Sequence, residues 1–106
     1  MKIGYILKLL RVRLKLSQSE MADKLGISQN YLSLLESDKR EPSLEKIARF
    51  AGKLGISKDA LLLACSDIPI ELKDKNRRTF VKLQNNIMSI LLIELTGEIG
   101  DWKESA

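Results

Sequence analysis

The chain has 106 residues, of which 44% are hydrophobic and 30% are charged. These values are typical of one soluble globular domain with a single modest core, and they argue against two large domains. The chain has no histidine and a single cysteine, Cys65. This composition excludes a disulfide within the chain, a zinc site of the usual four-ligand type and a catalytic triad that needs histidine.

The net charge of +4 is unevenly distributed along the chain. Residues 1–66 carry 12 basic and 7 acidic side chains, a net charge of +5, whereas residues 67–106 have a net charge of −1. A basic N-terminal part favours polyanionic partners, because contacts with phosphates release condensed counterions. We expect a reduced, cytoplasmic location, since the sequence shows no sign of an oxidising compartment, a signal peptide or a membrane span.

The N-terminal residues predict two helices. Hydrophobic residues recur at three- and four-residue spacing along the first, at Ile3, Ile6, Leu7, Leu10 and Leu14. Ser17 stands three residues before Glu20, which is the spacing of a capping box, and so predicts the start of a second helix. Gly26 can adopt the positive φ that ends a helix, so the second helix should have only about two turns.

Serines also precede the next helical stretches, as N-cap residues do, at Ser28, Ser43 and Ser57. Pro42 marks a break before the fourth helix, and Gly55 ends that helix. We assign its buried face to Leu44, Ile47, Ala48, Ala51 and Leu54, and the buried face of a short fifth helix to Leu61, Leu62 and Ala64. No useful stretch alternates as a strand would, so we expect five short helices between residues 2 and 65.

Residues 18–37 have the pattern of two helices joined by a tight turn. The apolar residues that hold these two helices together are Met21, Leu25, Ile27, Leu32 and Leu35. Ala22 is small where the helices cross, and Gly26 permits the turn. The opposite face of the second helix stays exposed, with Gln29, Asn30, Ser33 and Leu34. A helix of this width fits the major groove of B-form DNA.

Here the sequence resembles the Cro-like, lambda-repressor-like helix-turn-helix regulators of bacteria and phages, also called XRE-type. The resemblance spans about residues 3–64 and rests on Leu16–Gln18, Lys24–Ser28, Glu36 and Lys39–Ser43. It implies an all-α fold with a five-helix lambda-repressor-like DNA-binding domain, assigned here to residues 1–66. It also implies a protein that binds two DNA half-sites as a dimer and usually represses or activates transcription.

By position, the resemblance makes Gln29 and Asn30 the expected base readers, since amide side chains can form paired hydrogen bonds with adenine. Gln18 is expected to contact a phosphate and to brace Gln29. Ser28 offers a hydroxyl and the N-terminal amides of the recognition helix to a neighbouring phosphate. Tyr31 is a further candidate for DNA contact, although it could equally pack at the edge of the domain.

Two more positions on the recognition helix remain open. Ser33 is a candidate for DNA contact, and Leu34 either contacts a thymine methyl group or covers apolar surface. Arg11 and Glu36 match positions that pair in this family, and we interpret that pair as structural because it would fix the first helix against the third.

The loop after the recognition helix carries Lys39 and Arg40, which the resemblance places on the DNA backbone, where they would supply salt-dependent affinity. The alternative is that Lys39 and Arg40 only form a solvated loop and contact no DNA. Ser37 and Asp38 replace the Asn-Gly pair that is frequent here in the family. Asp tolerates a left-handed conformation less well than Gly, and its charge faces phosphate, so we expect a weaker backbone contact.

The C-terminal segment, residues 67–106, predicts a long helix from about Lys75 to Leu95, with Gly97 as its end. Residues 87–95 are apolar nearly all round, so contact with the DNA-binding domain would leave apolar surface uncovered. We therefore expect a homodimer through Phe80, Leu83, Ile87, Ile90 and Leu91. The alternatives are that the helix packs on its own core or binds another protein. Trp102 is a further candidate packing anchor.

The expected function is that of a sequence-specific transcriptional regulator, a repressor that binds double-stranded DNA at a palindromic operator in the nucleoid. The alternative is an antitoxin-type or other protein-interaction module that binds DNA only for autoregulation. We expect no enzyme activity, cofactor or metal, because the glycines form neither a P-loop nor a dinucleotide fingerprint and the acidic pairs are unclustered.

Overall fold

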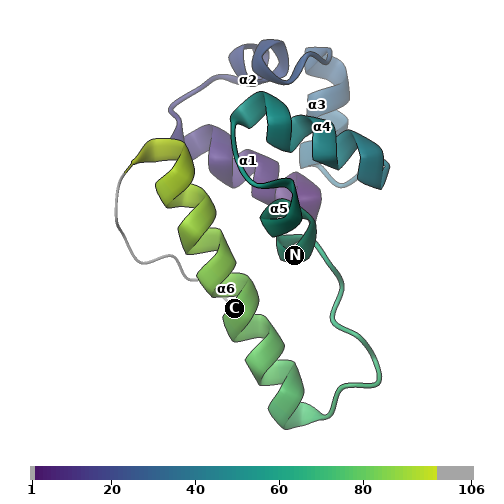
Figure 1. Cartoon of the computed structure of the whole chain (residues 1–106). Helices are drawn as coiled ribbons and strands as arrows, with labels where there is room; N and C mark the ends of the chain where they lie inside the picture. The colour runs from purple at the N-terminus through teal and green to yellow at the C-terminus, as the bar shows by residue number, and fades with distance from the viewer. Residues whose placement is uncertain (1, 98–106) are drawn as a thin grey trace.

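A computed structural model describes residues 2–97, and over that range it has six α-helices and no strand (Figure 1). The helices are α1 Ile3–Arg13, α2 Gln18–Leu25, α3 Gln29–Glu36, α4 Leu44–Leu54, α5 Lys58–Ala64 and α6 Asp74–Thr96. The all-α prediction, with five short helices followed by a long one, is confirmed. Trp102 lies outside the described residues.

The starts of the four short helices after α1 follow the predicted serines. In each case the serine Oγ accepts a hydrogen bond of 3.1 or 3.2 Å from a backbone N–H three residues later, at Ser17, Ser28, Ser43 and Ser57. The Ser17 N–H also donates to Glu20 Oε1 at 2.9 Å, which completes the capping box. These bonds satisfy N–H groups that have no partner within their own helix.

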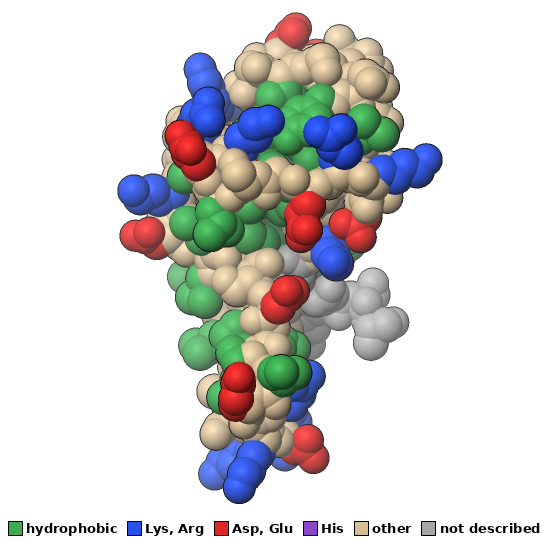
Figure 2. All heavy atoms as spheres, turned by 90° about the vertical axis from the view of Figure 1, so that its right-hand side faces the viewer, with side chains coloured by type: hydrophobic (Ala, Val, Ile, Leu, Met, Phe, Trp, Pro, Cys, Tyr) green, Lys and Arg blue, Asp and Glu red, His purple; other side chains and the backbone are tan. Residues whose placement is uncertain are grey.

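One hydrophobic core includes residues of all six helices. Its fully buried large side chains are Ile6, Leu7, Leu10, Met21, Leu32, Leu35, Leu61, Met88 and Leu91. The C-terminal half of α6 packs on α5 and α1, whereas its N-terminal half projects away from the other helices (Figure 1). Hydrophobic side chains are exposed along this projection, and Lys and Arg side chains lie at its tip (Figure 2).

The packing of α6 corrects one residue of the predicted dimer interface. Leu91 is fully buried against its own subunit's core, and Ile87 is partly buried against it, so Leu91 has no surface to offer a second molecule. Leu83 and Ile90 are each 52% exposed. The helix therefore packs on its own core with one face and leaves another face exposed, because a helix that is apolar nearly all round cannot bury every side on one neighbour. The division of the chain at residue 66 stays a prediction.

The predicted buried face of α4 was wrong at Leu44, which is 72% exposed. The helix buries Ile47, Ala51 and Leu54 as predicted, and it also buries Phe50, which was not among the predicted residues. Ala48 is half-buried. Leu44 is the first residue of α4 and lies at the edge of that face.

A polar side chain joins α6 to α5. Gln84 is only 4% exposed, and its Nε2 donates to the carbonyl oxygens of Leu63 at 3.3 Å, Ala64 at 3.3 Å and Ser66 at 2.8 Å. The last carbonyls of a helix have no partner within it, so Gln84 supplies the donor that the C-terminal end of α5 needs. This contact helps to fix α6 on the domain.

Candidate nucleic-acid interface

The helix-turn-helix unit consists of α2, a turn and α3. Gly26 has a φ of +74° and ends α2, and the next helix begins after Ser28. Met21, Leu25, Leu32 and Leu35 are buried between this unit and the rest of the core, as predicted. Burial of one side of α3 leaves its other side free to meet a ligand.

The expected base readers lie on that free side. Gln29 and Asn30 are exposed in the first turn of α3, where no side-chain hydrogen bond to another described residue occupies either amide. Ser33 and Leu34 are half-buried. An exposed pair of amides on a firmly packed helix has the donors and acceptors that recognition of a base edge requires.

A buried ion pair fixes the orientation of α3. Arg11 Nε lies 2.9 Å from Glu36 Oε2, and Arg11 Nη2 lies 3.0 Å from Glu36 Oε1. Their side chains are 15% and 4% exposed. Arg11 Nη1 also donates to the Leu16 carbonyl at 3.1 Å, so the pair links α1, the α1–α2 connection and the end of α3. The pair implied by the resemblance is therefore present, in the bidentate form that gives a guanidinium and a carboxylate geometric specificity.

Gln18 joins this pair. Its Nε2 donates to Glu36 Oε1 at 3.2 Å. Gln18 lies beside the last residue of α3, and Gln29 is seven residues earlier on that helix, so the expected brace on Gln29 stays a prediction for the DNA-bound protein. Seven residues of helix span about 10 Å. Gln18 thus helps to hold α2, α1 and α3 together.

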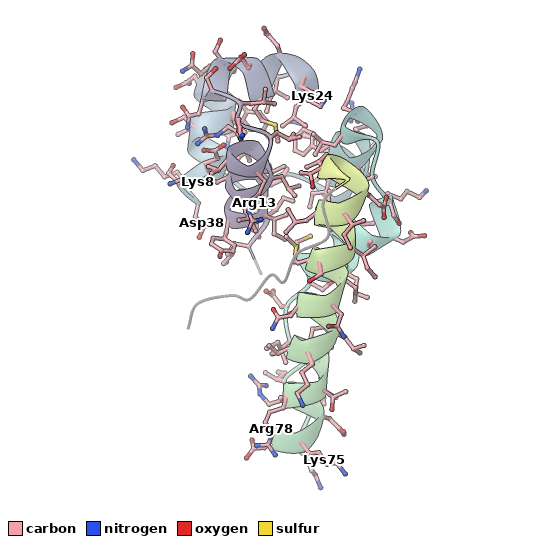
Figure 3. All side chains as sticks on the ribbon, turned by 90° about the vertical axis from the view of Figure 1, so that its left-hand side faces the viewer. Lys8, Arg13, Lys24, Asp38, Lys75 and Arg78 are labelled. Carbon is pink, nitrogen blue, oxygen red and sulfur yellow. The ribbon has the colours of Figure 1, made fainter. Side chains whose placement is uncertain are left out.

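The chain leaves α3 through a strained residue. Asp38 has a φ of +60°, a left-handed conformation usually taken by Gly. Its N–H donates to the Leu35 carbonyl at 3.1 Å, and the N–H of Lys39 donates to the Leu34 carbonyl at 2.9 Å. Lys39 and Arg40 follow, both exposed. Asp38 and Lys8 of α1 are found on the same side of the molecule (Figure 3).

Two surface pockets flank α3. One, of about 200 Å³, is lined by Lys8, Arg11, Gln18, Ser33, Glu36 and Ser37. It brings the predicted contacts Gln18 and Ser33 together beside Lys8, a cation that the sequence analysis did not assign to the site. The spacing of Lys8 and Arg11 along the first helix was the signal that could have found it.

The other pocket lies between the α2–α3 turn and α4 and has a volume of about 470 Å³. Its lining includes Ser28 and Tyr31, which were predicted, and the cations Lys46, Arg49 and Lys53, which were not. Lys46 Nζ is 4.7 Å from the centre of the Tyr31 ring and donates to the Tyr31 hydroxyl at 3.4 Å. Tyr31 is half-buried, so it packs at the edge of the domain and also borders this basic pocket.

The charge around this second pocket is largely positive. The one acidic contact among its cations is a loose pair between Arg49 and Glu45, at 3.6 Å, with both side chains well exposed. Exposed pairs of this kind are weak, and the described residues that line the pocket itself include no acidic residue. The three cations fall on one face of α4, at positions 46, 49 and 53, and that spacing in the sequence could have indicated them. The arrangement suits an anion that lies against the α2–α3 turn.

Other classes of site find no support in the described part of the chain. Residues 2–97 contain no cluster of three His, Cys, Asp or Glu side chains that could hold a metal ion. None of the helices in the same range has the length and apolar character needed to cross a lipid bilayer.

Comparisons with known proteins agree with this geometry. The helix-turn-helix family matches residues 7–61, which is just over half of the chain. The immunity repressor protein of Bacillus phage phi105 is 37% identical to this chain over 62 residues, which cover 58% of the chain and 43% of the phage protein. The chain thus spans less than half the length of this curated relative. No solved structure matches the chain.

Proposed function

The chain belongs to the helix-turn-helix family of DNA-binding transcriptional regulators, and from this premise we propose that it represses transcription by binding a palindromic operator as a homodimer. The observation that carries the proposal is the way in which α3 is held in the domain. Its inner side and its last residue are held by the core and by the Arg11–Glu36 pair, and its first turn presents two free amides. Repression is inferred from the similarity to the phage immunity repressor protein.

We assign base reading to Gln29 and Asn30. In this proposal α3 enters the major groove with its first turn, and each amide forms paired hydrogen bonds with an adenine edge. Ser33 and Leu34 lie one turn further along and are half-buried, so they contact the groove with less of their surface. Leu34 offers only apolar contact, which fits a thymine methyl group.

Phosphate contacts come from both sides of α3 in this proposal. Gln18 and Lys8 hold the backbone on one side, and Ser28 and Tyr31 hold it on the other, with the cations of α4 behind them. Lys39 and Arg40 contact phosphates beyond the end of α3. These contacts supply most of the affinity and its salt dependence, and they carry little sequence information.

The homodimer is proposed from the exposed face of α6. Leu83 and Ile90 are each 52% exposed, and Phe80 and Ile87 are half-buried on the same side of the helix. A twofold dimer would bury this face and would place two recognition helices on successive major grooves, roughly 34 Å apart. Occupation of an operator by such a dimer would exclude polymerase, and no step of this mechanism involves catalysis.

Selection from a library of random DNA duplexes at ~0.15 M salt tests the proposal. We expect enrichment of an inverted repeat whose half-sites are about one helical turn apart. A variant with Gln29 and Asn30 both replaced by alanine is the control, and it should enrich no sequence while it still binds duplexes weakly. Enrichment of a single half-site would contradict the dimer, and no enrichment by the unaltered protein would contradict sequence-specific binding.

The second candidate function is an interaction module that uses α6 to bind a different protein. The same exposed face of α6 favours it. Purification of the full chain after expression in its host, followed by measurement of the mass of the complex, separates the two candidates. A mass of twice the chain supports the homodimer, and a stoichiometric second protein supports the interaction module.

A further inference from the structure

The exposed face of α6 has the spacing of a coiled-coil seam. Phe80, Leu83, Ile87 and Ile90 follow one another at intervals of three, four and three residues. These are the a and d positions of a heptad repeat, at which two helices pack side chains into each other. The spacing continues to Lys73 at the beginning of the helix and to Glu94 near its end, and both are exposed.

The seam is separate from the side of α6 that packs on its own subunit. Gln84, Met88, Leu91 and Leu92 are buried on that side. At 100° per residue, the centre of the seam lies about 100° around the helix axis from the centre of the buried side. The seam is therefore accessible to a partner while the contact between α6 and its own domain stays intact.

Charge is strongly polarised along α6. Residues 73–82 contain five basic side chains and one acidic side chain, whereas Glu94 is the sole charged residue from 83 to 97. Lys75 and Arg78 mark the basic end, which lies at the tip of the projection, far from the helix-turn-helix unit (Figure 3). Two such helices repel each other when their basic ends lie side by side and avoid this repulsion when the ends point in opposite directions.

On the basis of the homodimer proposed above, we infer that the occupant of this seam is α6 of a second copy of the chain in antiparallel orientation. Phe80 then lies opposite the partner's Ile90, and Leu83 lies opposite the partner's Ile87. Glu94 lies opposite the partner's Asn76, and the partner's Lys73 is three residues further along the seam, a rise of about 4.5 Å. Each end of the seam thus joins an acidic residue to a basic one.

The parallel orientation has the opposite electrostatic result. It places Lys73 beside the partner's Lys73, and Glu94 beside the partner's Glu94. Like charges at both ends of the seam oppose association, and the basic clusters of residues 73–82 of the two copies would lie at the same end of the dimer. The hydrophobic layers are formed in either orientation, so the charged ends decide between them.

Reversal of the charges at Lys73 and Glu94 in the full chain tests the orientation. The dissociation constant of the dimer is measured by sedimentation equilibrium. In the antiparallel dimer, Lys73→Glu and Glu94→Lys each bring like charges together and should weaken association roughly two- to fivefold, the scale of exposed ion pairs. The double variant should restore the original constant. In a parallel dimer, like charges face each other before and after each substitution, so neither single variant should change the dissociation constant. Unchanged dissociation constants for both single variants would therefore overturn the inference.

Lys75→Glu is the matched control, because Lys75 is in the same turn as Lys73 but about 100° away from the seam. It should leave the dissociation constant within the error of the unaltered chain. An effect as large as that of Lys73→Glu would mean that overall charge governs association, and this too would overturn the inference.

Cross-linking gives a second, independent measurement. In a Cys65→Ser background, Phe80→Cys and Ile90→Cys are made as separate chains and treated with a short bis-maleimide. In the antiparallel dimer, the mixture of the two chains should cross-link and each chain alone should not. Efficient cross-linking of each chain with itself would indicate the parallel dimer. A protein that sediments as a monomer at every concentration would instead refute the homodimer of the proposed function, which keeps the two failures distinct.

Discussion

Gly4 in α1 packs directly against the backbone of Leu35 in α3, so closely that a β-carbon on Gly4 would overlap the Leu35 carbonyl oxygen. The backbone of α3 cannot give way easily there, because the adjacent Glu36 is held by Arg11. The distance between the first helix and the recognition helix is thus set by the absence of a side chain at one position.

We expect Gly4→Ala to destabilise the protein by roughly 1–3 kcal/mol, although Ala normally favours a helix over Gly by about 1 kcal/mol. Gly52→Ala is the matched control, because Gly52 is also helical and a β-carbon added there would meet no atom within 4 Å. That variant should gain stability. Urea unfolding followed by circular dichroism measures both, and a stabilised Gly4→Ala protein would show that the two helices can separate freely.

Removal of Arg11 should be costly as well. Glu36 has a side chain that is 4% exposed, so Arg11→Ala leaves a buried carboxylate whose remaining described partner is Gln18. Breaking a buried pair in this way typically costs about 3–5 kcal/mol. Arg13→Ala removes an exposed arginine from the same helix and should change the unfolding midpoint little. Equal effects of the two substitutions would mean that the pair contributes no more than a surface charge.

The helix starts could be predicted from the sequence because their causes are local. Ser17 and Glu20 lie three residues apart, and their reciprocal hydrogen bonds depend on little beyond that spacing. Gly4 and Gln84 could not be predicted in this way. Their roles come from contacts with Leu35 and with the end of α5, which are distant in the sequence, and no pattern within either helix indicates them.

The extent of the C-terminal helix was predicted well, but the neighbours of its apolar residues were predicted only in part. Ile87 and Leu91 are both apolar and four residues apart, so periodicity alone assigned them to one interface. The structure divides this apolar surface into a side that packs on α1 and α5 and a side that stays exposed, and Leu91 belongs to the first. Composition does not reveal such a division, because both sides use the same residue types.

The capping box of α2 predicts a specific dependence on pH. A hydrogen bond from the Ser17 N–H lowers the pKa of Glu20 below its usual value. The ionised form therefore contributes stability above the unfolded-state pKa, and this contribution is lost as the pH falls through the folded-state pKa. Glu20→Gln should lower the melting temperature at about pH 7, and its effect should become smaller as the pH falls through the folded-state pKa and the carboxyl takes up a proton. Glu71→Gln, at an exposed position, serves as the control, and a Glu20 effect that is constant with pH would contradict the ionised cap.

Gln84 should be essential for the docking of α6 on α5. Gln84→Glu replaces the donor to three carbonyl groups with a carboxylate that cannot donate when ionised. We expect a loss of about 1–3 kcal/mol in stability, and faster amide exchange at the end of α5 and in the C-terminal half of α6. Asn86→Asp makes the same chemical change at an exposed position of α6 and should be nearly neutral. Unchanged exchange in Gln84→Glu would mean that hydrophobic packing alone holds α6.

The proposed division between base reading and backbone contact predicts two different responses to substitution. Gln29→Ala should cost about 1–3 kcal/mol on the selected operator and little on unrelated duplexes, because the lost bonds are to a base edge. Lys39→Ala should weaken binding to all duplexes and reduce the slope of log affinity against log salt by about 0.9, because one phosphate contact is lost. Fluorescence anisotropy over a salt series measures both quantities. If the two substitutions weaken every duplex equally and change the slope equally, α3 does not read bases through Gln29, since a contact with a base must distinguish one sequence from another.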